Sequence, residues 1–478
     1  MEASQEYDAG SPGPACIQPS GVDIGSPQSE DCLFLNIFLP ANDTQWTTPK
    51  KVLVYIHGGA LIMGAANENI PGSLVTKEDI IVVTINYRLA WLGCLKGNNS
   101  GLAGNQGFKD QVMALRWVHD NIAAFGGDPS DVTVAGESSG ADSVSLLCVV
   151  PETASLFSQG ILMSGGHFIS QSTPGSSDIL VNQLLMLLPE CWPAEIPESK
   201  RTMERTLSEA EIDAVLTCLR SLPEDKFKLA AGTVYYGQQV AIDGEYFEAA
   251  IPEMVRDEEL LKRTKFLNKN FLVSLTNNEG ALFSHGIFAY FKHEPGVGLG
   301  QVEAVKMLGL SPALYDRILR WYTDTGDYNF NPVYSMFSDS VFTKEAFAFL
   351  QAHNRFPSGN GTSRFLMFNH NVTYLEPYYQ GTPHAFDIPY LFDMGPDHIL
   401  NAYYGLQTGK NFTQEDEELK KTYMKMIGDF VRTGNPGLSL QTQGGSEWPP
   451  YNATDEYYLK FQTDAAVGQF PLQARRDL

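Results

Sequence analysis

The apolar positions of this 478-residue chain gather in short runs that are separated by longer stretches of mixed character. Each run is rich in Val, Ile, Leu or Phe and lacks a regular alternation of polar and apolar residues. Such runs predict strands that are buried on both faces, in a largely parallel sheet covered by helices. The predicted strands are residues 32–39, 52–57, 80–87, 132–134, 160–164, 271–276 and 364–369, the last of these being the final strong core strand.

Helical periodicity occupies the segments between these runs. Residues 105–125 repeat apolar side chains at helical spacing, and the Gly-Gly-Asp-Pro sequence at residues 126–129 ends that helix. Residues 171–270 carry more charge and few strand signals, which predicts a helical insertion. Other helices are predicted at residues 209–221, 344–353 and 415–433, whereas the Gly-, Pro- and Ser-rich residues 1–31 are predicted to be irregular. Without a repeat or linker, the chain is predicted to form one α/β domain over residues 1–478.

The segment around Ser138 predicts a strand, a tight turn and a helix in succession. It contains Gly-Glu-Ser-Ser-Gly at residues 136–140. In such a turn the backbone is so crowded that only glycine fits two residues before and after the serine, whose hydroxyl is exposed above the sheet edge. The pattern should arise by chance about 0.3 times in a chain with this much glycine. A turn without chemistry is therefore the alternative, and the flanking strand and helix favour Ser138 as a nucleophile.

A second glycine-rich loop follows the strand at residues 52–57. It reads His-Gly-Gly-Ala at residues 57–60. Acyl transfer builds negative charge on a carbonyl oxygen, and each preorganised N–H donor there lowers the barrier by roughly 3–4 kcal/mol. The N–H groups of Gly59, Ala60 and Ser139 are predicted to form such an oxyanion hole. A plain glycine turn is the alternative, and His57 is interpreted as structural.

A nucleophilic serine needs a base, and the base needs a carboxylate that orients it. After a Gly-x-Ser-x-Gly turn the expected chain order is serine, acid, histidine. Glu279 lies in the turn Asn-Asn-Glu-Gly at residues 277–280, after the strand at residues 271–276, and is the predicted acid. Asp243 is the second choice, because its turn lacks a convincing strand before it.

The histidine should follow the last core strand. His370 ends that strand directly, and His384 lies in a turn made rigid by Gly and Pro, so position alone barely separates the two. His353 falls within a helical pattern and is interpreted as a packed side chain.

Composition and charge restrict the function classes. Hydrophobic residues make up 43% of the chain and charged residues 19%, which is typical of globular proteins. With 33 basic and 56 acidic residues the net charge is −23, which argues against binding to nucleic acid or an anionic membrane. We find no apolar run long enough to span a bilayer, no signal peptide and no lipidation motif.

Cysteines and sequons point outside the cell. Cys94 and Cys148 lie in apolar surroundings and are predicted to be buried thiols. The other four lie where disulfides are plausible and allow three pairings, of which the nearest-neighbour one joins Cys16 to Cys32 and Cys191 to Cys218. Asn-x-Ser/Thr sequons are present at Asn42, Asn98, Asn360, Asn371, Asn411 and Asn452. No spacing of Cys or His indicates a metal, and no cofactor is expected.

Taken in order, these motifs resemble the type-B carboxylesterase/cholinesterase family over nearly the whole chain. The family implies an α/β-hydrolase fold, a mostly parallel central sheet flanked by helices with a helical insertion. The matching stretches are residues 29–36, 57–59, 86–89, 104–107, 125–129, 136–140, 242–244, 279–280, 384–390, 433–436 and 448–451.

The resemblance assigns roles that position alone leaves open. It implies Ser138 as nucleophile, Glu279 as acid and His384 rather than His370 as base. It also implies the oxyanion hole named above, the disulfides Cys16–Cys32 and Cys191–Cys218, and a structural ion pair between Arg88 and Asp128. The substrate pocket is expected to include Glu137, Tyr236, Leu282 and Phe283.

The chain departs from the family pattern at several positions. Ala60 and Ala385 stand where glycine is usual, and Ser139 replaces an alanine. The segment between Cys16 and Cys32 lacks the tryptophan that binds choline in cholinesterases, and Leu282 replaces an aromatic residue, so cation–π recognition is poorly supported. The family's N-terminal strands and signal peptide are missing, so we expect an N-terminally incomplete sequence.

We therefore predict a secreted, glycosylated serine carboxylesterase that hydrolyses a small-molecule carboxylic ester through an acyl-enzyme. The alternative is a catalytically silent adhesion or binding protein of the same family, which a complete set of Ser, Glu and His candidates disfavours. The ester and the oligomeric state do not follow from the sequence.

Overall fold

A computed structural model describes most of the chain and gives it an α/β architecture. The described residues are 9–19, 24–40, 48–97, 102, 104–166, 176–231, 240–281, 311–325, 332–375, 380–399, 401, 407–437 and 447–470. A nine-stranded sheet runs through the molecule in the order β11-β10-β9-β8-β7-β6-β4-β5-β3. All its pairings are parallel except β3 with β5 and β10 with β11.

Every predicted core strand is present, with shifted ends. The strands are β3 (Leu35–Phe38), β4 (Lys50–Ile56), β5 (Ile81–Ile85), β6 (Gly127–Glu137), β7 (Gln159–Met163), β8 (Asn270–Thr276), β9 (Ser363–Phe368), β10 (Tyr457–Phe461) and β11 (Ala466–Gln469). The last two extend the sheet beyond the strand predicted to be the final one. Their sequences mix polar residues such as Lys460 and Gln469 with apolar ones, because this edge of the sheet is only partly buried.

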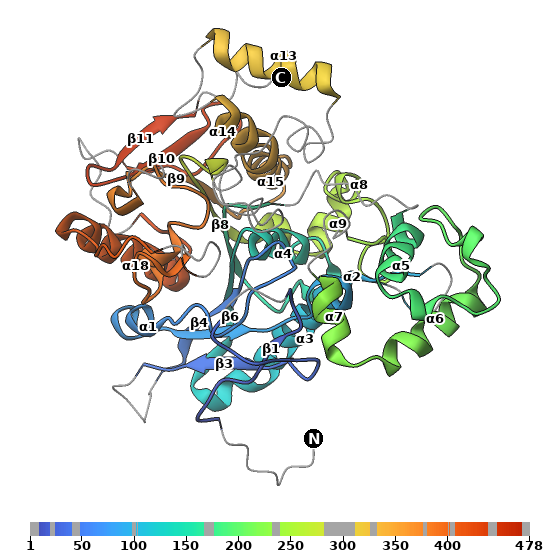
Figure 1. The fold of residues 1–478 in the computed structure, drawn as a ribbon. Helices are drawn as coiled ribbons and strands as arrows, with labels where there is room; N and C mark the ends of the chain where they lie inside the picture. Colours follow the sequence, from blue (N-terminus) through green and yellow to red (C-terminus); the bar gives the residue numbers. More distant parts are fainter. Residues whose placement is uncertain are drawn as a thin grey trace.

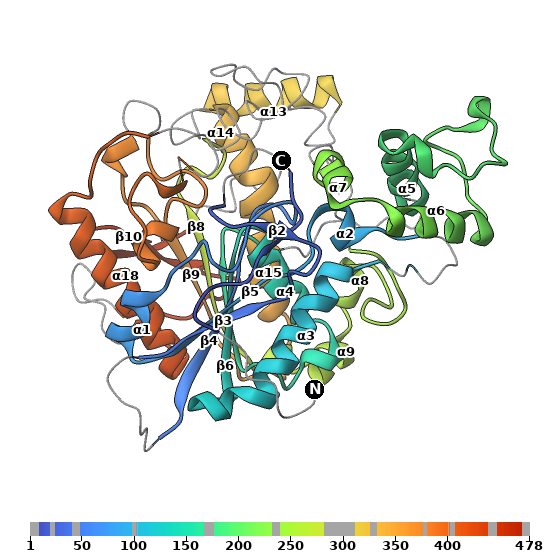
Figure 2. The same ribbon diagram turned by 60° about the horizontal axis from the view of Figure 1, so that its bottom comes forward.

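Helices cover both faces of the sheet (Figures 1 and 2). Successive side chains of β4 pack into the two apolar cores on opposite faces of the sheet. Val52, Val54 and Ile56 lie in one core, and Leu53 and Tyr55 lie in the other. The first face carries α3 (Gln106–Asn121), α4 (Ser139–Leu147), α8 (Ile251–Met254), α9 (Glu258–Arg263) and α15 (Lys344–His353). The second carries α1 (Gly72–Glu78), α16 (Ile388–Leu391) and α18 (Gln414–Thr433). This double cover explains why the strands are apolar without alternation.

The predicted helical insertion stands to one side of the sheet (Figure 1). It contains α5 (Ser176–Leu187), α6 (Glu209–Ser221) and α7 (Glu224–Ala231) and has an apolar core of its own. Its tie to the main body includes α2 (Ala90–Cys94), where the Trp91 indole donates to the Ala230 carbonyl over 3.0 Å. The remaining described helices are α13 (Pro312–Thr325) and α14 (Pro332–Phe337).

Both predicted disulfides are present. Cys191–Cys218 joins the turn after α5 to α6, and Cys16–Cys32 closes the N-terminal segment. That segment was predicted to be irregular, yet it holds a two-residue parallel pair of β1 (Ala15–Cys16) and β2 (Gln28–Ser29). Of the two free cysteines, Cys148 is buried as predicted, whereas Cys94 is only partly buried.

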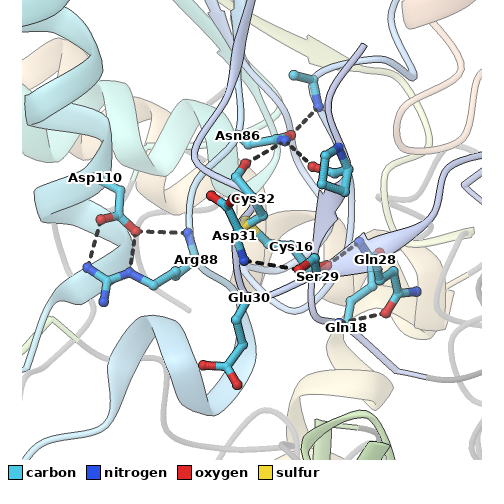
Figure 3. The surroundings of a disulfide bond; sticks show 12 residues. Cys16, Gln18, Gln28, Ser29, Glu30, Asp31, Cys32, Asn86, Arg88 and Asp110 are labelled. Atoms are coloured by element: carbon cyan, nitrogen blue, oxygen red, sulfur yellow. Dashed lines mark hydrogen bonds and ion pairs between the residues drawn. A yellow bond between two sulfur atoms is a disulfide. The ribbon is translucent and has the colours of Figure 1, made fainter. Parts of the chain in front are cut away.

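The predicted ion pair between Arg88 and Asp128 is wrong. Arg88 instead binds Asp110 of α3 with two guanidinium nitrogens, each at 2.7 Å (Figure 3). Arg88 follows the carboxyl end of β5, whereas Asp128 lies at the opposite edge of the sheet, near the start of β6. There Asp128 accepts hydrogen bonds from Ser130.

Candidate active site

Ser138 lies in the turn between β6 and α4, as the sequence predicts. Its backbone has φ 55° and ψ −126°, a strained conformation that lifts the serine out of the strand. The two glycines leave no choice of residue. A Cβ on Gly136 would lie 2.3 Å from the backbone of Gly140, and one on Gly140 would lie 2.1 Å from the Ile56 carbonyl oxygen. Close packing of turn, helix and strand therefore fixes Ser138 at the carboxyl edge of the sheet.

Glu279 follows β8 at the same edge and is buried. Its Oε1 accepts from the Ser164 hydroxyl over 2.7 Å and from the Thr276 backbone N–H over 2.6 Å. Ser164 follows β7, the strand between β6 and β8. Donors from two strand ends thus orient the carboxylate and leave Oε2 for another partner.

That partner is His384, whose Nδ1 lies 2.6 Å from Glu279 Oε2. The histidine arrives on a loop that pairs with the end of β8, through a parallel β-bridge between Asn278 and Pro383. The Asn277 and Asn278 side chains add bonds to this loop: Asn277 Oδ1 accepts from the Thr382 N–H over 2.7 Å, and Asn278 Nδ2 donates to the Gln380 carbonyl over 2.7 Å. The acid and the histidine are therefore held together by main chain as well as by side chains.

The other edge of the His384 ring faces the nucleophile turn. Its Nε2 lies 3.2 Å from Oε1 of Glu137, the residue before Ser138, and the Phe342 ring packs on the imidazole at 4.5 Å. Burial by itself lowers the pKa of His384, but Glu137 and Glu279 outweigh it and raise the pKa to about 9. Burial raises the pKa of Glu137 to about 8, against the effect of His384. The pair therefore retains a proton through neutral pH.

The loop after β4 lies against this turn. A Cβ on Gly58 would lie 3.1 Å from Ser138 Cβ and 2.7 Å from Glu137 Oε2, so only glycine fits there. Gly59 and Ala60 follow with φ 100° and 57°. These are the two loop residues whose N–H groups the sequence assigns to an oxyanion hole, and Ser139 begins α4 beside them.

His57 has a structural environment, as predicted. Its Nδ1 lies 2.8 Å from the Gly58 carbonyl, and its ring stacks on Tyr87 at 4.4 Å. Burial lowers its pKa to about 4, despite the bond to Gly58.

The runner-up residues lie elsewhere. Asp243 caps its own turn by accepting from the backbone N–H groups of residues 245–247. His353 is buried against the rings of Phe266 and Phe271. His370 binds Asp416 of α18 at 2.7 Å.

Three predicted pocket residues, Tyr236, Leu282 and Phe283, lie outside the described residues, as do the sequons at Asn42 and Asn98. The fourth, Glu137, lines a cavity of about 20 Å³ with His57, Gly58, Glu68 and Ala385, among others, which is room for about one water molecule.

Sequence reasoning missed several residues around the triad candidates. Ser164 could have been found, because it ends a core strand next to the nucleophile strand. Phe342 and Asp387 gave no local signal. Asp387 is buried beside the site, and its burial together with the Glu279 charge raises its pKa to about 7.

Comparison with known proteins decides the family. The sequence model described as the carboxylesterase family matches residues 3–477. The chain belongs to the carboxylesterase family. This membership confirms the predicted resemblance and makes the protein a serine carboxylesterase, a carboxylic-ester hydrolase.

Individual relatives agree. Acylcarnitine hydrolase of Mus musculus is 32% identical over 458 residues, covering 93% of this chain and 73% of the relative. Cocaine esterase of Homo sapiens is 30% identical over 459 residues, covering 94% of this chain and 74% of the relative. Cholinesterase of Mus musculus is 29% identical over 466 residues, covering 91% of this chain and 69% of the relative.

A solved structure of a thermophilic PNB esterase superposes with a TM-score of 0.72 at 24% identity, covering 97% of this chain and 88% of that one. This likeness confirms the predicted α/β-hydrolase fold. Within the described ranges, no helix of this carboxylesterase is long and apolar enough to cross a bilayer.

Proposed function

We propose that Ser138, His384 and Glu279 form the catalytic triad of this carboxylesterase and that hydrolysis proceeds through an acyl-enzyme. The observation that carries the proposal is the bond of 2.6 Å between His384 Nδ1 and Glu279 Oε2, with the Nε2 edge turned toward the strained turn of Ser138. A base oriented by a carboxylate next to a serine on such a turn is the arrangement that activates a hydroxyl.

The first half of the reaction transfers the acyl group. Glu279 accepts a hydrogen bond from the Nδ1–H of His384. The other ring nitrogen, Nε2, therefore acts as the base. Nε2 takes the proton from Ser138 as the serine oxygen bonds to the ester carbonyl carbon. The carbonyl oxygen becomes an oxyanion, held by the N–H groups of Gly59, Ala60 and Ser139. When this intermediate collapses, the C–O bond to the alcohol breaks and His384 returns the proton to the leaving alcohol.

Water then repeats the sequence on the acyl-enzyme. His384 accepts a proton from the water that attacks the acyl carbon, and gives it to the oxygen of Ser138 as the carboxylic acid leaves. The serine is restored. Because the base must be neutral at the start of both halves, activity should rise with pH as His384 loses its proton.

The test is burst-phase hydrolysis of p-nitrophenyl acetate by wild type and Ser138→Ala. Wild type should release a burst of nitrophenol equal to the number of active sites, and the variant should show no burst and a kcat lower by about 10⁶-fold. A Ser138→Ala variant that retained the burst would refute the assignment. Labelling by a fluorophosphonate probe separates this function from a catalytically silent binding protein, since only an activated serine reacts.

We infer a small-molecule carboxylic ester as substrate, without assigning its acyl or alcohol part. Two relatives are named for the hydrolysis of acylcarnitine and of cocaine. Rates on esters of increasing acyl length would define the preference of this chain.

We infer further that the protein is a secreted or lumenal glycoprotein. Two disulfides support an oxidising compartment. Among the described sequons, Asn360, Asn371 and Asn411 are exposed and Asn452 is partly exposed. Expression through a secretory pathway should give a product whose mass falls after N-glycosidase treatment, and an unchanged mass would refute glycosylation.

A further inference from the structure

The loop that follows β4 holds three successive residues in the left-handed backbone region. Gly59, Ala60 and Leu61 have φ angles of 100°, 57° and 58°. Glycine adopts this region freely, whereas alanine and leucine do so only when their surroundings hold them there. Two strained residues therefore form the loop that carries the proposed oxyanion donors, which raises the question of what fixes it.

One end of the loop is held by Ser139. The backbone N–H of Leu61 donates to Ser139 Oγ over 3.1 Å. Ser139 is buried and is the first residue of α4, directly after Ser138. Alanine, which the family usually has at this position, has no acceptor to offer, so this bond is a feature of the present sequence.

The other end of the loop is held by Tyr87. Its hydroxyl donates to the His57 carbonyl over 2.8 Å, and the tyrosine is buried. The two buried hydroxyls therefore bind the loop at separate points, Ser139 at Leu61 and Tyr87 at His57.

A buried hydroxyl thus holds each end of the strained loop: Ser139 accepts from the Leu61 N–H, and Tyr87 donates to the His57 carbonyl. Both bonds lie in a buried setting, where a hydrogen bond is electrostatically stronger than in water.

We propose that the Ser139 hydroxyl at the Leu61 end of the loop and the Tyr87 hydroxyl at the His57 end are positioning groups that fix the N–H groups of Gly59 and Ala60 for the developing oxyanion. The proposal rests on the proposed function. The side chain of Ser139 touches no reacting atom; its backbone N–H has a separate role in the oxyanion hole and remains in any variant of the side chain. Preorganised donors stabilise the oxyanion because they need not reorient during the reaction.

The first experiment removes the hydroxyl with Ser139→Ala. We expect kcat for p-nitrophenyl acetate to fall about tenfold, less than the hundredfold or more that loss of a direct oxyanion donor costs, while KM stays within about twofold. Affinity for a trifluoromethyl ketone, which gains an oxyanion when a serine oxygen adds to it, should fall by a similar factor of about ten. A merely structural serine would leave the ratio of ketone affinity to KM unchanged, and that result would overturn the proposal.

The second experiment removes the hydroxyl at the other end of the loop with Tyr87→Phe. We expect kcat and ketone affinity to fall together, as in Ser139→Ala, while KM stays within about twofold. Unchanged kcat and ketone affinity in Tyr87→Phe would overturn the role of this hydroxyl. Tyr87→Phe also carries the kcat and ketone tests alone if Ser139→Ala does not fold.

Ser145→Ala is the matched control, because it deletes another buried hydroxyl from α4, one that donates to the Asp142 carbonyl within the helix. Its kcat should stay within about twofold of wild type. Ser138→Ala is measured beside these variants. If Ser138→Ala keeps full activity, the proposed function fails. If it is inactive while Ser139→Ala matches wild type, only the positioning role fails.

Discussion

Two buried histidines within the described residues, His384 and His370, each lie against a carboxylate and look alike in isolation. His384 lies 2.6 Å from Glu279, and His370 lies 2.7 Å from Asp416. The surroundings differ. Glu279 is oriented by Ser164 and leaves the far edge of His384 facing the turn of Ser138, whereas Asp416 also accepts from the Tyr390 hydroxyl and from Thr413.

The second pair is part of a helix cap. Thr413 and Asp416 exchange bonds in the capping box that begins α18. Although burial raises it, the bonds from His370 and Thr413 hold the pKa of Asp416 well below its usual range. A histidine beside a carboxylate can act as a base only where its other ring nitrogen faces a nucleophile. In the proposed mechanism His384 meets this condition, whereas His370 is part of the cap of α18.

Replacing each histidine in turn tests most directly whether the two pairs have different roles. His384→Asn should lower kcat for p-nitrophenyl acetate by about 10⁶-fold, because the proposed nucleophile loses its base. The kcat/KM of His370→Asn should stay within about threefold of the wild-type value once rates are expressed per folded molecule. Steady-state kinetics with circular dichroism as the folding control measures both, and a comparable loss in His370→Asn would contradict the assignment of roles.

Changing Asp416 should affect stability instead of activity. Asp416→Asn removes the charge that Thr413 and His370 bind, so the free energy of unfolding should fall by about 2–3 kcal/mol at pH 7. A carboxylate with a lowered folded-state pKa stabilises the protein above its unfolded pKa of about 3.8 and loses that effect as the pH falls. The difference between variant and wild type should therefore shrink below pH 4 in urea unfolding. A constant difference would show that the charge is not its cause.

The pH dependence of activity should be determined by the loss of the proton from His384. Glu137→Gln removes a carboxylate that raises the pKa of His384, so the rise of kcat/KM with pH should move to lower pH by roughly one unit. Profiles from pH 5 to 10 would measure it. Asp416→Asn provides the contrast, because it should leave the midpoint where wild type has it. A midpoint that moves upward in Glu137→Gln would reverse the inferred sign.

The smallest effect concerns the groups that orient each carboxylate. Ser164→Ala should lower kcat about fivefold with little change in KM, because Glu279 loses one of its donors. Tyr390→Phe removes the corresponding donor to Asp416 and should leave kcat unchanged while lowering the unfolding midpoint. Equal kinetic effects in the two variants would remove the distinction between the pairs.

Much of the fold follows from residue pattern. Continuous apolar runs predict β4 to β9, because strands buried on both faces need apolar side chains throughout. The half-exposed strands β10 and β11 have no such run. Ser138 and Glu279 could be predicted because each directly follows a core strand.

The choice between His370 and His384 could not be derived from position, since both follow β9. What separates them are contacts between distant segments. The bridge from Asn278 to Pro383 carries His384 to the acid, while Asp416, from α18, binds His370. The same limit explains the wrong partner for Arg88, whose true partner Asp110 is set by how α3 packs beside the end of β5.

For the proposed triad, the bridge between Asn278 and Pro383 also makes catalysis a late event in folding. Glu279 and His384 are 105 residues apart in the chain, and bringing such ends together costs loop-closure entropy before any contact repays it. The pairing of β8 with β9 must be in place first, because the bridge extends from the end of β8. Esterase activity therefore reports the long-range register of the sheet, and its recovery during refolding should lag behind the recovery of helical structure.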